Sequence, residues 1–220
     1  MSVPAIVLSN TEMANDHFCS CVAIDTGSGS EQVRLLLPGG QHLNPRSLSL
    51  GAWQVRTMWV PGRVLTLSEI RKENPRPTHP EDRVLMEPCV RFGELVPNSL
   101  MRRTVEEFTY PSLEDLFPGF KKSGGKGYKE AVGRFDRSVG YVRCTSVQFS
   151  ASGYATVRQG HNVFECKVEG AKLLHDLRMA NVLTGTVYTR PLLRFSLAGA
   201  FTGDGKFDPP RCYLMLSGMR

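Results

Sequence analysis

The stretch GFKKSGGKGYKE at residues 119–130 combines glycines and lysines in a way that could hold a phosphate group. A nucleotide-binding P-loop needs a glycine, four further residues and then Gly-Lys-Ser/Thr, because the lysine reaches the β- and γ-phosphates and the hydroxyl binds magnesium. Gly119 and Gly124 have the required spacing, but Gly125 occupies the lysine position and Lys126 stands one place late. The residue after Lys126 is a glycine, which has no hydroxyl. The sequence therefore does not predict a P-loop at this site.

The same stretch opens a strongly basic segment in which aromatic residues are interleaved with lysine and arginine. Proteins that bind single strands combine a basic track for the phosphates with aromatic platforms for the bases, and glycines would let the loop follow a backbone. We therefore predict contact with single-stranded DNA or RNA, with Tyr128 and Phe135 as stacking candidates. The predicted nucleic-acid-binding residues are Lys121, Lys122, Lys126, Tyr128, Lys129, Arg134, Phe135, Arg137 and Arg143. The alternative is a mobile, solvated linker whose aromatic side chains belong to the adjacent core.

Other residue patterns that could support catalysis or cation binding are incomplete. His175 and Asp176 are neighbours on a predicted helix, so their side chains point in different directions. The HPED sequence at 79–82 places an imidazole beside carboxylates, but in a proline-rich turn without a partner triad. Asp204 and Asp208 lie in TGDGKFDPP, which lacks the remaining oxygen ligands of an EF-hand loop. We predict no catalytic residue, no metal site and no cofactor; an active site assembled from distant residues is the alternative.

The cysteines are dispersed along the chain and form no CxxC pair. Structural zinc sites usually bring their ligands in close pairs, so we expect buried, reduced thiols. A zinc site assembled from distant cysteines and His17 is the alternative. The six cysteines are Cys19, Cys21, Cys89, Cys144, Cys166 and Cys212.

The overall charge is basic, with 27 Lys and Arg against 21 Asp and Glu, a formal net charge of +6. A basic excess favours polyanionic partners, but it carries no information about the fold. The first apolar run is too short for a signal peptide and lacks a basic segment before it. No stretch approaches the roughly 20 apolar residues that span a bilayer. We expect a soluble, cytoplasmic protein that does not associate with membranes.

Short apolar runs separated by turn residues predict a succession of strands in the first part of the chain. The Trp53–Trp59 run is read as one of these strands, and its two tryptophans, six residues apart, would share a face. We expect that face to belong to the core, and a stacking platform is the alternative. A helix is expected in NSLMRRTVEEF at 98–108, and SLEDLF at 112–117 resembles a capping box with Asp115 in place of glutamate. The expected strands in the first part are 5–8, 18–24, 33–37, 53–59, 64–67 and 84–86.

The β pattern resumes after residue 139 and is interrupted once. GAKLLHDLRMAN at 170–181 has an apolar stripe of leucines with a glycine and an asparagine at its ends, which predicts a helix. The expected strands around it are 140–149, 155–158, 163–168, 186–198 and 212–216. The chain thus consists of a β unit, a partly helical segment and a second β unit.

About five strands with a helix among them are what an OB-fold requires, and two such units fit 220 residues. We predict a mainly β fold with two small OB-like β-barrels joined by a partly helical connector. The expected N-terminal barrel covers 1–88, the helical and Gly/Lys-rich connector covers 89–137, and the C-terminal barrel covers 138–220. SH3-like barrels or an irregular β-sandwich are the alternatives.

Several stretches together resemble the bacterial dual OB-containing domain family. AIVLSN followed by CSCVAID is similar to that family's first strand, Asn loop and CVAGI-like start, and VRLLLPGG is similar to its WIRPV-like strand. RPTHPEDRVL resembles its proline-rich turn with a polar ending, and the terminal PPRCYLMLSGMR resembles its final CY strand. The resemblance implies two OB-like barrels, a role in nucleic-acid or protein interaction, and association with bacterial mobile elements or defence systems. It implies no particular functional residues.

These observations together predict a non-enzymatic module that binds single-stranded DNA or RNA as a subunit of a larger bacterial defence or mobile-element complex. The first alternative is a protein-interaction adaptor that docks on a nuclease, helicase or other effector and whose basic face is incidental. The second is an enzyme with a composite site.

Overall fold

The computed structural model describes residues 2–12, 17–72, 78–87, 90–169 and 184–220. Contacts within the chain divide it into two units, each with its own core. Unit 1 comprises Met1–Arg76 and Glu81–Phe108, and unit 2 comprises Pro77–Pro80 and Thr109–Arg220. The segment expected as a connector, 89–137, is divided between the two units at Phe108.

Unit 1 is built from short strands rich in aliphatic and β-branched residues, as in FCSCVAID and SEQVRLLL. The expected helix at 98–108 is confirmed as α2. The elements in chain order are β1 (Val3–Glu12), β2 (Phe18–Asp25), β3 (Ser30–Leu37), the 3₁₀ turn η1 (Pro38–Gly40), β4 (Gln41–His42), the 3₁₀ turn η2 (Arg46–Leu48), α1 (Ala52–Met58), β5 (Arg63–Leu67), β6 (Ile70–Arg71), β7 (Asp82–Leu85), β8 (Val90–Leu95) and α2 (Asn98–Glu107).

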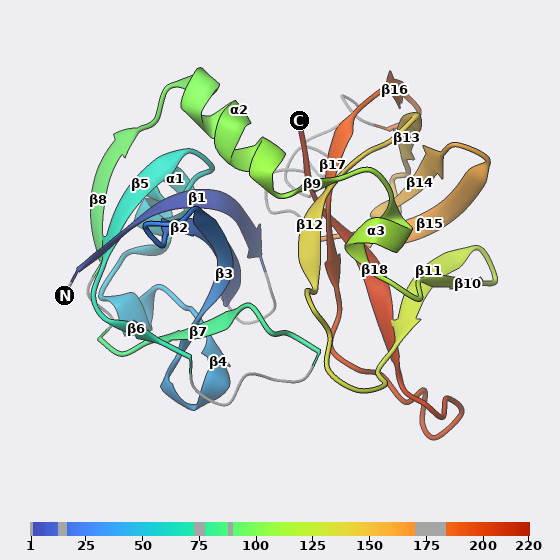
Figure 1. Cartoon of the computed structure of the whole chain (residues 1–220), viewed down its shortest axis with the longest axis horizontal. Coiled ribbons are helices and arrows are strands. Elements are labelled where there is room, and N and C mark those ends of the chain that lie inside the picture. The colour runs from blue at the N-terminus through green and yellow to red at the C-terminus, as the bar shows by residue number, and fades with distance from the viewer. Residues whose placement is uncertain (1, 13–16, 73–77, 88–89, 170–183) are drawn as a thin grey trace. The chain divides into compact units, whose positions relative to one another are not determined.

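The strand order of unit 1 closes on itself. β1 pairs with β2 and β2 with β3, both antiparallel, and β3 runs parallel to β7 (Figure 1). β5 pairs with β1, and β6, which follows β5 after only two residues, pairs with β7. Taken as one bent strand, β5 and β6 return the sheet from β7 to β1. If the two-residue β4 is left out, β5 and β6 together are the fourth strand, and helix α1 lies between the third and the fourth strands. This is the order of an OB-type barrel.

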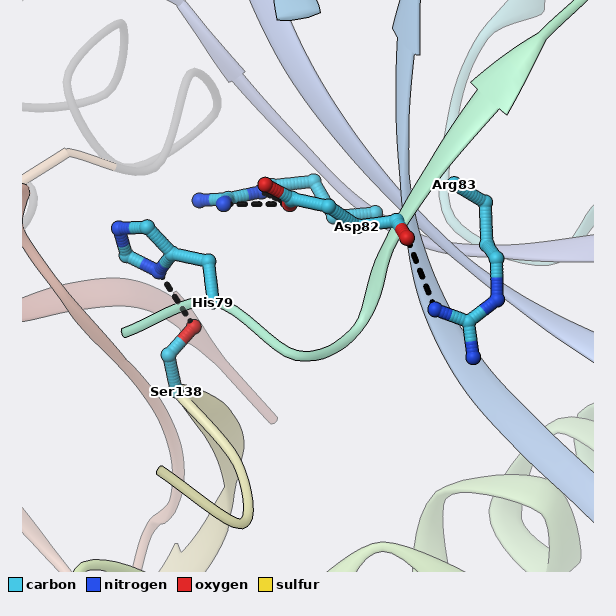
Figure 2. Close-up of polar contacts among 5 residues, drawn as sticks. His79, Asp82, Arg83 and Ser138 are labelled. Carbon is cyan, nitrogen blue, oxygen red and sulfur yellow. Dashed lines mark hydrogen bonds and ion pairs between the residues drawn. The ribbon is translucent and has the colours of Figure 1, made fainter. Parts of the chain in front are cut away.

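The parallel pairing of β3 with β7 is fixed by a buried ion pair. Arg34 and Asp82 face each other in the register, and Arg34 Nη2 lies 2.5 Å from Asp82 Oδ1. Arg83, the next residue on β7, donates from Nη1 to the Asp82 carbonyl oxygen at 2.8 Å (Figure 2) and also forms an ion pair with Glu31 of β3. Because a charge left without its partner in such surroundings is costly, these contacts stabilise the pairing that closes the barrel.

Residues 52–58 form helix α1, so the predicted strand at 53–59 is wrong. Gln54 starts the helix by accepting from the Gly51 backbone N–H at 2.7 Å, as the third residue of a capping box does. Val55 and Trp59 are four residues apart and both are buried, whereas Trp53 is 72% exposed. The two tryptophans therefore do not share a face. The WQVRTMW sequence has apolar residues at the two-residue spacing of a strand and at the four-residue spacing of a helix, and packing selects the helix.

Trp59 is a large, fully buried side chain of the unit 1 core. Its ring packs edge-on against Phe18 and Phe92, with centroids 5.2 and 5.9 Å away. Its indole Nε1–H donates to Ser20 Oγ at 2.6 Å, which satisfies the one polar group that this side chain buries.

Near its start, unit 2 contains the capped turn that the sequence predicts at 112–117. Ser112 Oγ accepts from the Asp115 backbone N–H at 3.1 Å, and Leu113 and Leu116 of the short helix enter the core. The helix expected at 170–181 lies outside the described residues. The elements are β9 (Thr109–Tyr110), α3 (Leu113–Leu116), β10 (Lys121–Ser123), β11 (Lys126–Glu130), β12 (Val139–Arg143), β13 (Ser146–Phe149), β14 (Tyr154–Gln159), β15 (Asn162–Val168), β16 (Val187–Thr189), β17 (Leu192–Leu197) and β18 (Arg211–Met219).

The strand order of unit 2 closes in the same way as that of unit 1. β12 and β13 are separated by two residues and act as one bent strand, which pairs with β14 on one side and with β16 and β17 on the other. β14 pairs with β15, β15 runs parallel to β18, and β18 returns to β17. The prediction of a mainly β fold with two OB-like units is thus confirmed. In the part of the chain that the structure describes, no helix combines the length and the apolar character needed to cross a membrane.

Candidate nucleic-acid interface

Residues 121–130 form an antiparallel hairpin, β10–β11, in which Lys121 faces Tyr128 and Ser123 faces Lys126. The two-residue turn is Gly124-Gly125, with φ of 56° and 80°. Positive φ at both central positions is the requirement of the type I′ turn, which matches the twist of paired strands and favours glycine. The glycines therefore shape a tight turn, and the loop following a nucleic-acid backbone that the sequence predicts here is not formed.

The hairpin is fixed to the barrel by two strands. β11 pairs antiparallel with β18, with Tyr128 opposite Tyr213, and the Gly125 carbonyl accepts from the Glu165 backbone N–H on β15 at 2.8 Å (Figure 1). Gly127 is buried beneath the Phe120 ring, and a Cβ at this position would lie 2.5 Å from Phe120 Cζ. The hairpin is thus an ordered part of the unit 2 sheet.

Three lysines of this hairpin are exposed: Lys121, Lys122 and Lys126. Lys121 Nζ lies 2.8 Å from Glu130 Oε2, in an ion pair whose side chains are 50% and 30% exposed. Lys122 Nζ donates to the neutral Asn162 Oδ1 at 2.8 Å. Exposed contacts of this kind are weak, so all three ammonium groups can be drawn to a phosphate.

Two other predicted cations are held against the body of unit 2. Lys129 Nζ donates to the Pro118 carbonyl and lies 4.6 Å from the Phe135 ring centroid. The Arg137 guanidinium lies 4.5 Å from the centroid of the Tyr110 ring. These cation–π contacts favour the positions seen here and are shorter than the 5.9 Å between Lys126 Nζ and the Tyr154 ring centroid. Lys129 and Arg137 are therefore less available to a ligand than the three exposed hairpin lysines are.

The remaining predicted cations lie apart from the hairpin along the chain or across the sheet. Arg134 is exposed in the loop between β11 and β12. Arg143 is exposed at the end of β12, which is separated from β11 by β18 and β17 in the strand order. The structure therefore groups Lys121, Lys122 and Lys126 on one element and does not bring Arg143 to them.

Tyr128 and Phe135 do not present free ring faces. They are 6% and 2% exposed, and Phe135 belongs to the unit 2 core. Tyr128 is covered by the Arg211 guanidinium, 4.4 Å from its ring centroid, and lies 6.1 Å from the Tyr213 ring. A base cannot stack on either ring as the chain is folded, so both lose the predicted stacking role.

An aromatic cluster that the sequence analysis missed lies beside the hairpin. It consists of Phe201 and Phe207 from the loop between β17 and β18, together with Tyr213 of β18 and Arg211. The Phe201 ring centroid is 6.2 Å from that of Phe207 and 6.4 Å from that of Tyr213. The sequence AGAFTGDGKFDPP carries a signal for it, because two phenylalanines stand there among turn residues.

The positive charge of the protein resides in unit 2. Residues 109–220 contain 16 Lys and Arg against 9 Asp and Glu, a formal charge of +7, and residues 77–80 carry none. The residues of unit 1 contain 11 Lys and Arg against 12 Asp and Glu, a formal charge of −1. The polyanion-binding potential indicated by the whole sequence is therefore concentrated in the unit that carries the hairpin.

His79 and Ser138 form a buried polar contact within unit 2 (Figure 2). His79 Nδ1 lies 2.8 Å from Ser138 Oγ, and both residues are 1% exposed. A serine beside a histidine can act as nucleophile and base, but a substrate must then reach the hydroxyl. Because both side chains are enclosed, the contact serves here to hold the turn at residues 78–80 beside the start of β12.

The described cysteines are free thiols. Burial raises the pKa of Cys144 to about 12 and that of Cys212 to about 11, so neither is a thiolate near neutral pH. Within the described ranges, no three His, Cys, Asp or Glu side chains are grouped in a way that could hold a metal ion.

No protein-family model matches the chain, and no curated protein matches its sequence. The resemblance to the bacterial dual OB-containing domain family is therefore confirmed only as far as the two OB-type units, and not as family membership.

Solved structures with an overall likeness include the Ifi202 HINa domain in complex with 20 bp dsDNA, which is 10% identical at a TM-score of 0.39 and covers 100% of this chain and 95% of that chain. The p204 HINb domain is 15% identical at a TM-score of 0.36 and covers 98% of this chain and 91% of that chain. A murine DNA binding protein bound with ds DNA is 11% identical at a TM-score of 0.36 and covers 100% of this chain and 97% of that chain. At these identities and TM-scores, the likeness carries no inference about function.

Proposed function

We propose that this protein is a non-enzymatic nucleic-acid-binding module that holds single-stranded DNA or RNA on the outer face of unit 2. The observation that carries the proposal is the exposure of Lys121, Lys122 and Lys126 on one ordered hairpin of a unit whose formal charge is +7. Phosphate groups bind such a cluster by displacing condensed counterions, and this term supplies most of the affinity of sequence-independent binding.

The hairpin extends a surface that OB-folds use for oligonucleotides. In the barrel order of unit 2, β14 and β15 occupy the second and third positions, whose outer face and adjoining loops are the usual binding region of this fold. Lys126 is in register with Glu165 of β15 and lies 5.9 Å from the centroid of the Tyr154 ring on β14. Exposed Arg158 and Lys167 add cations to the same two strands. The use of this face is proposed by analogy with other OB-folds.

The predicted setting, a subunit of a bacterial defence or mobile-element complex in the cytoplasm, belongs to the proposal as well. This setting rests on the sequence resemblance, whereas the non-enzymatic role rests on the absence of catalytic motifs such as GxSxG and HExxH from the sequence. The alternative is an adaptor that binds another protein through a surface unrelated to the lysines.

Lysine acetylation footprinting of the full chain tests the proposal. With and without a poly-thymidine oligonucleotide at low salt, mass spectrometry measures how fast each ammonium group reacts with an acetylating reagent. We expect the oligonucleotide to slow acetylation of Lys121, Lys122 and Lys126 and to leave exposed Lys72 of unit 1 unchanged. Equal rates at the hairpin lysines would reject the proposed face, and co-purification of one stoichiometric protein partner with those equal rates would favour the adaptor.

A further inference from the structure

Phe201 is an aromatic side chain left half in solvent, in the loop between β17 and β18. It is 50% exposed, and among the exposed large hydrophobic residues of unit 2 that the structure describes it is the aromatic one, beside Val132, Val163 and Val187. An exposed aromatic ring forfeits the favourable transfer from water that a core position provides. A ring supported on one side and open on the other is suited to bind a second flat ring.

The loop that carries Phe201 is internally fixed. Phe201 and Arg211 exchange two backbone hydrogen bonds of 2.9 Å, and the Phe207 N–H donates to the Thr202 carbonyl at 2.8 Å. Gly203 has a φ of 60°, and a Cβ on it would lie 2.5 Å from Phe207 Cε2, so only glycine lets the Phe207 ring lie against this turn. The loop therefore presents the Phe201 ring in a defined position at little entropic cost.

The rings of Phe201, Phe207 and Tyr213 contact one another at tilted or edge-on angles. The Arg211 guanidinium lies between two of them, 4.0 Å from the Phe207 centroid and 4.4 Å from the Tyr128 centroid. Tyr213 touches both Phe201 and Phe207, with centroid distances of 6.4 and 6.5 Å. These contacts support the inner side of the Phe201 ring and leave its exposed part to the solvent.

The cluster adjoins Lys121 of the hairpin through two cross-strand pairs. Tyr213 is opposite Tyr128 in the β11–β18 register, and Tyr128 is opposite Lys121 in the hairpin. Within the loop, Lys206 is offset by the exposed carboxylates of Asp204 and Asp208. The loop thus supplies an aromatic surface without a net positive charge, whereas the hairpin supplies the cations.

We infer that Phe201 is a stacking platform for an unpaired base of the nucleic acid whose phosphates lie along the hairpin lysines, an inference that rests on the proposed function. Aromatic stacking binds any base through its π-face and requires that the base be unpaired and unstacked from its neighbours. The loop therefore makes the site select single strands over duplexes, and the hairpin alone does not discriminate between them.

The test compares two oligonucleotides that share a backbone. One is a thymidine strand of about 16 nucleotides, a length within the range that one OB-fold covers, and the other has the same length with tetrahydrofuran abasic residues in place of the nucleosides. Fluorescence anisotropy measures the affinity of the full chain and of Phe201→Ala, Phe201→Trp and the control Val132→Ala, which truncates another exposed apolar side chain of unit 2. Circular dichroism and thermal melting confirm that each variant is folded.

We expect Phe201→Ala to weaken binding of the thymidine strand by about 5- to 150-fold, which corresponds to the loss of one base stack. Binding of the abasic strand and the salt dependence should stay unchanged, and Phe201→Trp and Val132→Ala should bind as the native chain does. The inference is overturned if Phe201→Ala weakens the binding of both oligonucleotides equally, or of neither. It is also overturned if the native chain binds both oligonucleotides with the same affinity. These results would leave the proposed function intact. Failure of the native chain to bind either strand at low salt would instead overturn the proposed function.

Discussion

Replacing Lys122 and Lys126 with alanine should reduce the salt dependence of oligonucleotide binding by an amount that follows from the structure. Lys122 donates to a neutral amide oxygen and Lys126 lies over an aromatic ring, so each ammonium group can neutralise one phosphate. For a single strand, the slope of log K against log salt changes by about 0.7 per phosphate contact, so the double variant should lose about 1.4. Between 50 and 200 mM salt, the affinity ratio of native to variant protein should therefore shrink by about 7-fold.

The assay is fluorescence anisotropy of a labelled thymidine oligonucleotide, titrated with the full chain at several salt concentrations. The matched control is Arg102→Ala with Arg103→Ala, which removes two exposed cations from α2 of unit 1 and changes the net charge equally. Adding Lys121→Ala to the double variant should lower the slope by less than a further 0.7 or so, because Lys121 is already paired with Glu130.

Two results would refute this reasoning. A slope that is the same in the native chain and in the Lys122 and Lys126 variant would mean that these lysines touch no phosphate. An equal loss of slope in the Arg102 and Arg103 control would mean that the net charge, and not the hairpin, determines the binding. Replacing both lysines with arginine should restore the native slope, because the charges stay in place.

Further predictions concern the packing that supports the site. Gly127→Ala should lower the free energy of unfolding by about 1–3 kcal/mol in urea titrations, since its Cβ would meet Phe120 at 2.5 Å; an unchanged midpoint would show that the hairpin is not packed in this way. Ser20→Ala should cost about 1–3 kcal/mol because the Trp59 indole N–H loses its acceptor, and native-like thermal melting of this variant would contradict that. Burial raises the pKa of Cys144 from 9.0 to about 12, so the unfolded thiol ionises first and the free energy of unfolding should fall as pH rises through this range, by about 1.4 kcal/mol per pH unit. Cys144→Ala should remove that part of the slope, and an equal slope in both proteins would disprove it.

The strands could be predicted from the sequence because their burial follows a local pattern. FCSCVAID and SEQVRLLL are apolar enough to form the barrel wall, and turn residues bound them. Helix α1 could not be recognised in this way, since WQVRTMW has apolar residues at spacings of both two and four. Tertiary packing of Val55 and Trp59 into one core decides between them.

For the candidate site, the sequence indicates which residues are charged or aromatic, but only part of their exposure. Charge and exposure usually go together, so the exposure of Lys121 and Lys126 could be expected from the sequence. The two adjacent glycines were interpreted as a flexible loop, whereas they form a tight hairpin turn. The burial of Phe135 and the exposure of Phe201 depend on contacts between strands that are distant in the chain. A single sequence shows that both are aromatic, but it does not show which of them faces the solvent.

Direct binding of a single strand by the full chain tests the central claim, that unit 2 holds nucleic acid by its phosphates. Anisotropy of a labelled thymidine oligonucleotide should rise on titration with the protein at low salt, and the affinity should fall linearly with the logarithm of the salt concentration. A plot of log K against log salt should have a slope of about −1.4 or steeper, because Lys122 and Lys126 alone are expected to contribute that much. No rise in anisotropy, or an affinity that does not change with salt, would contradict it.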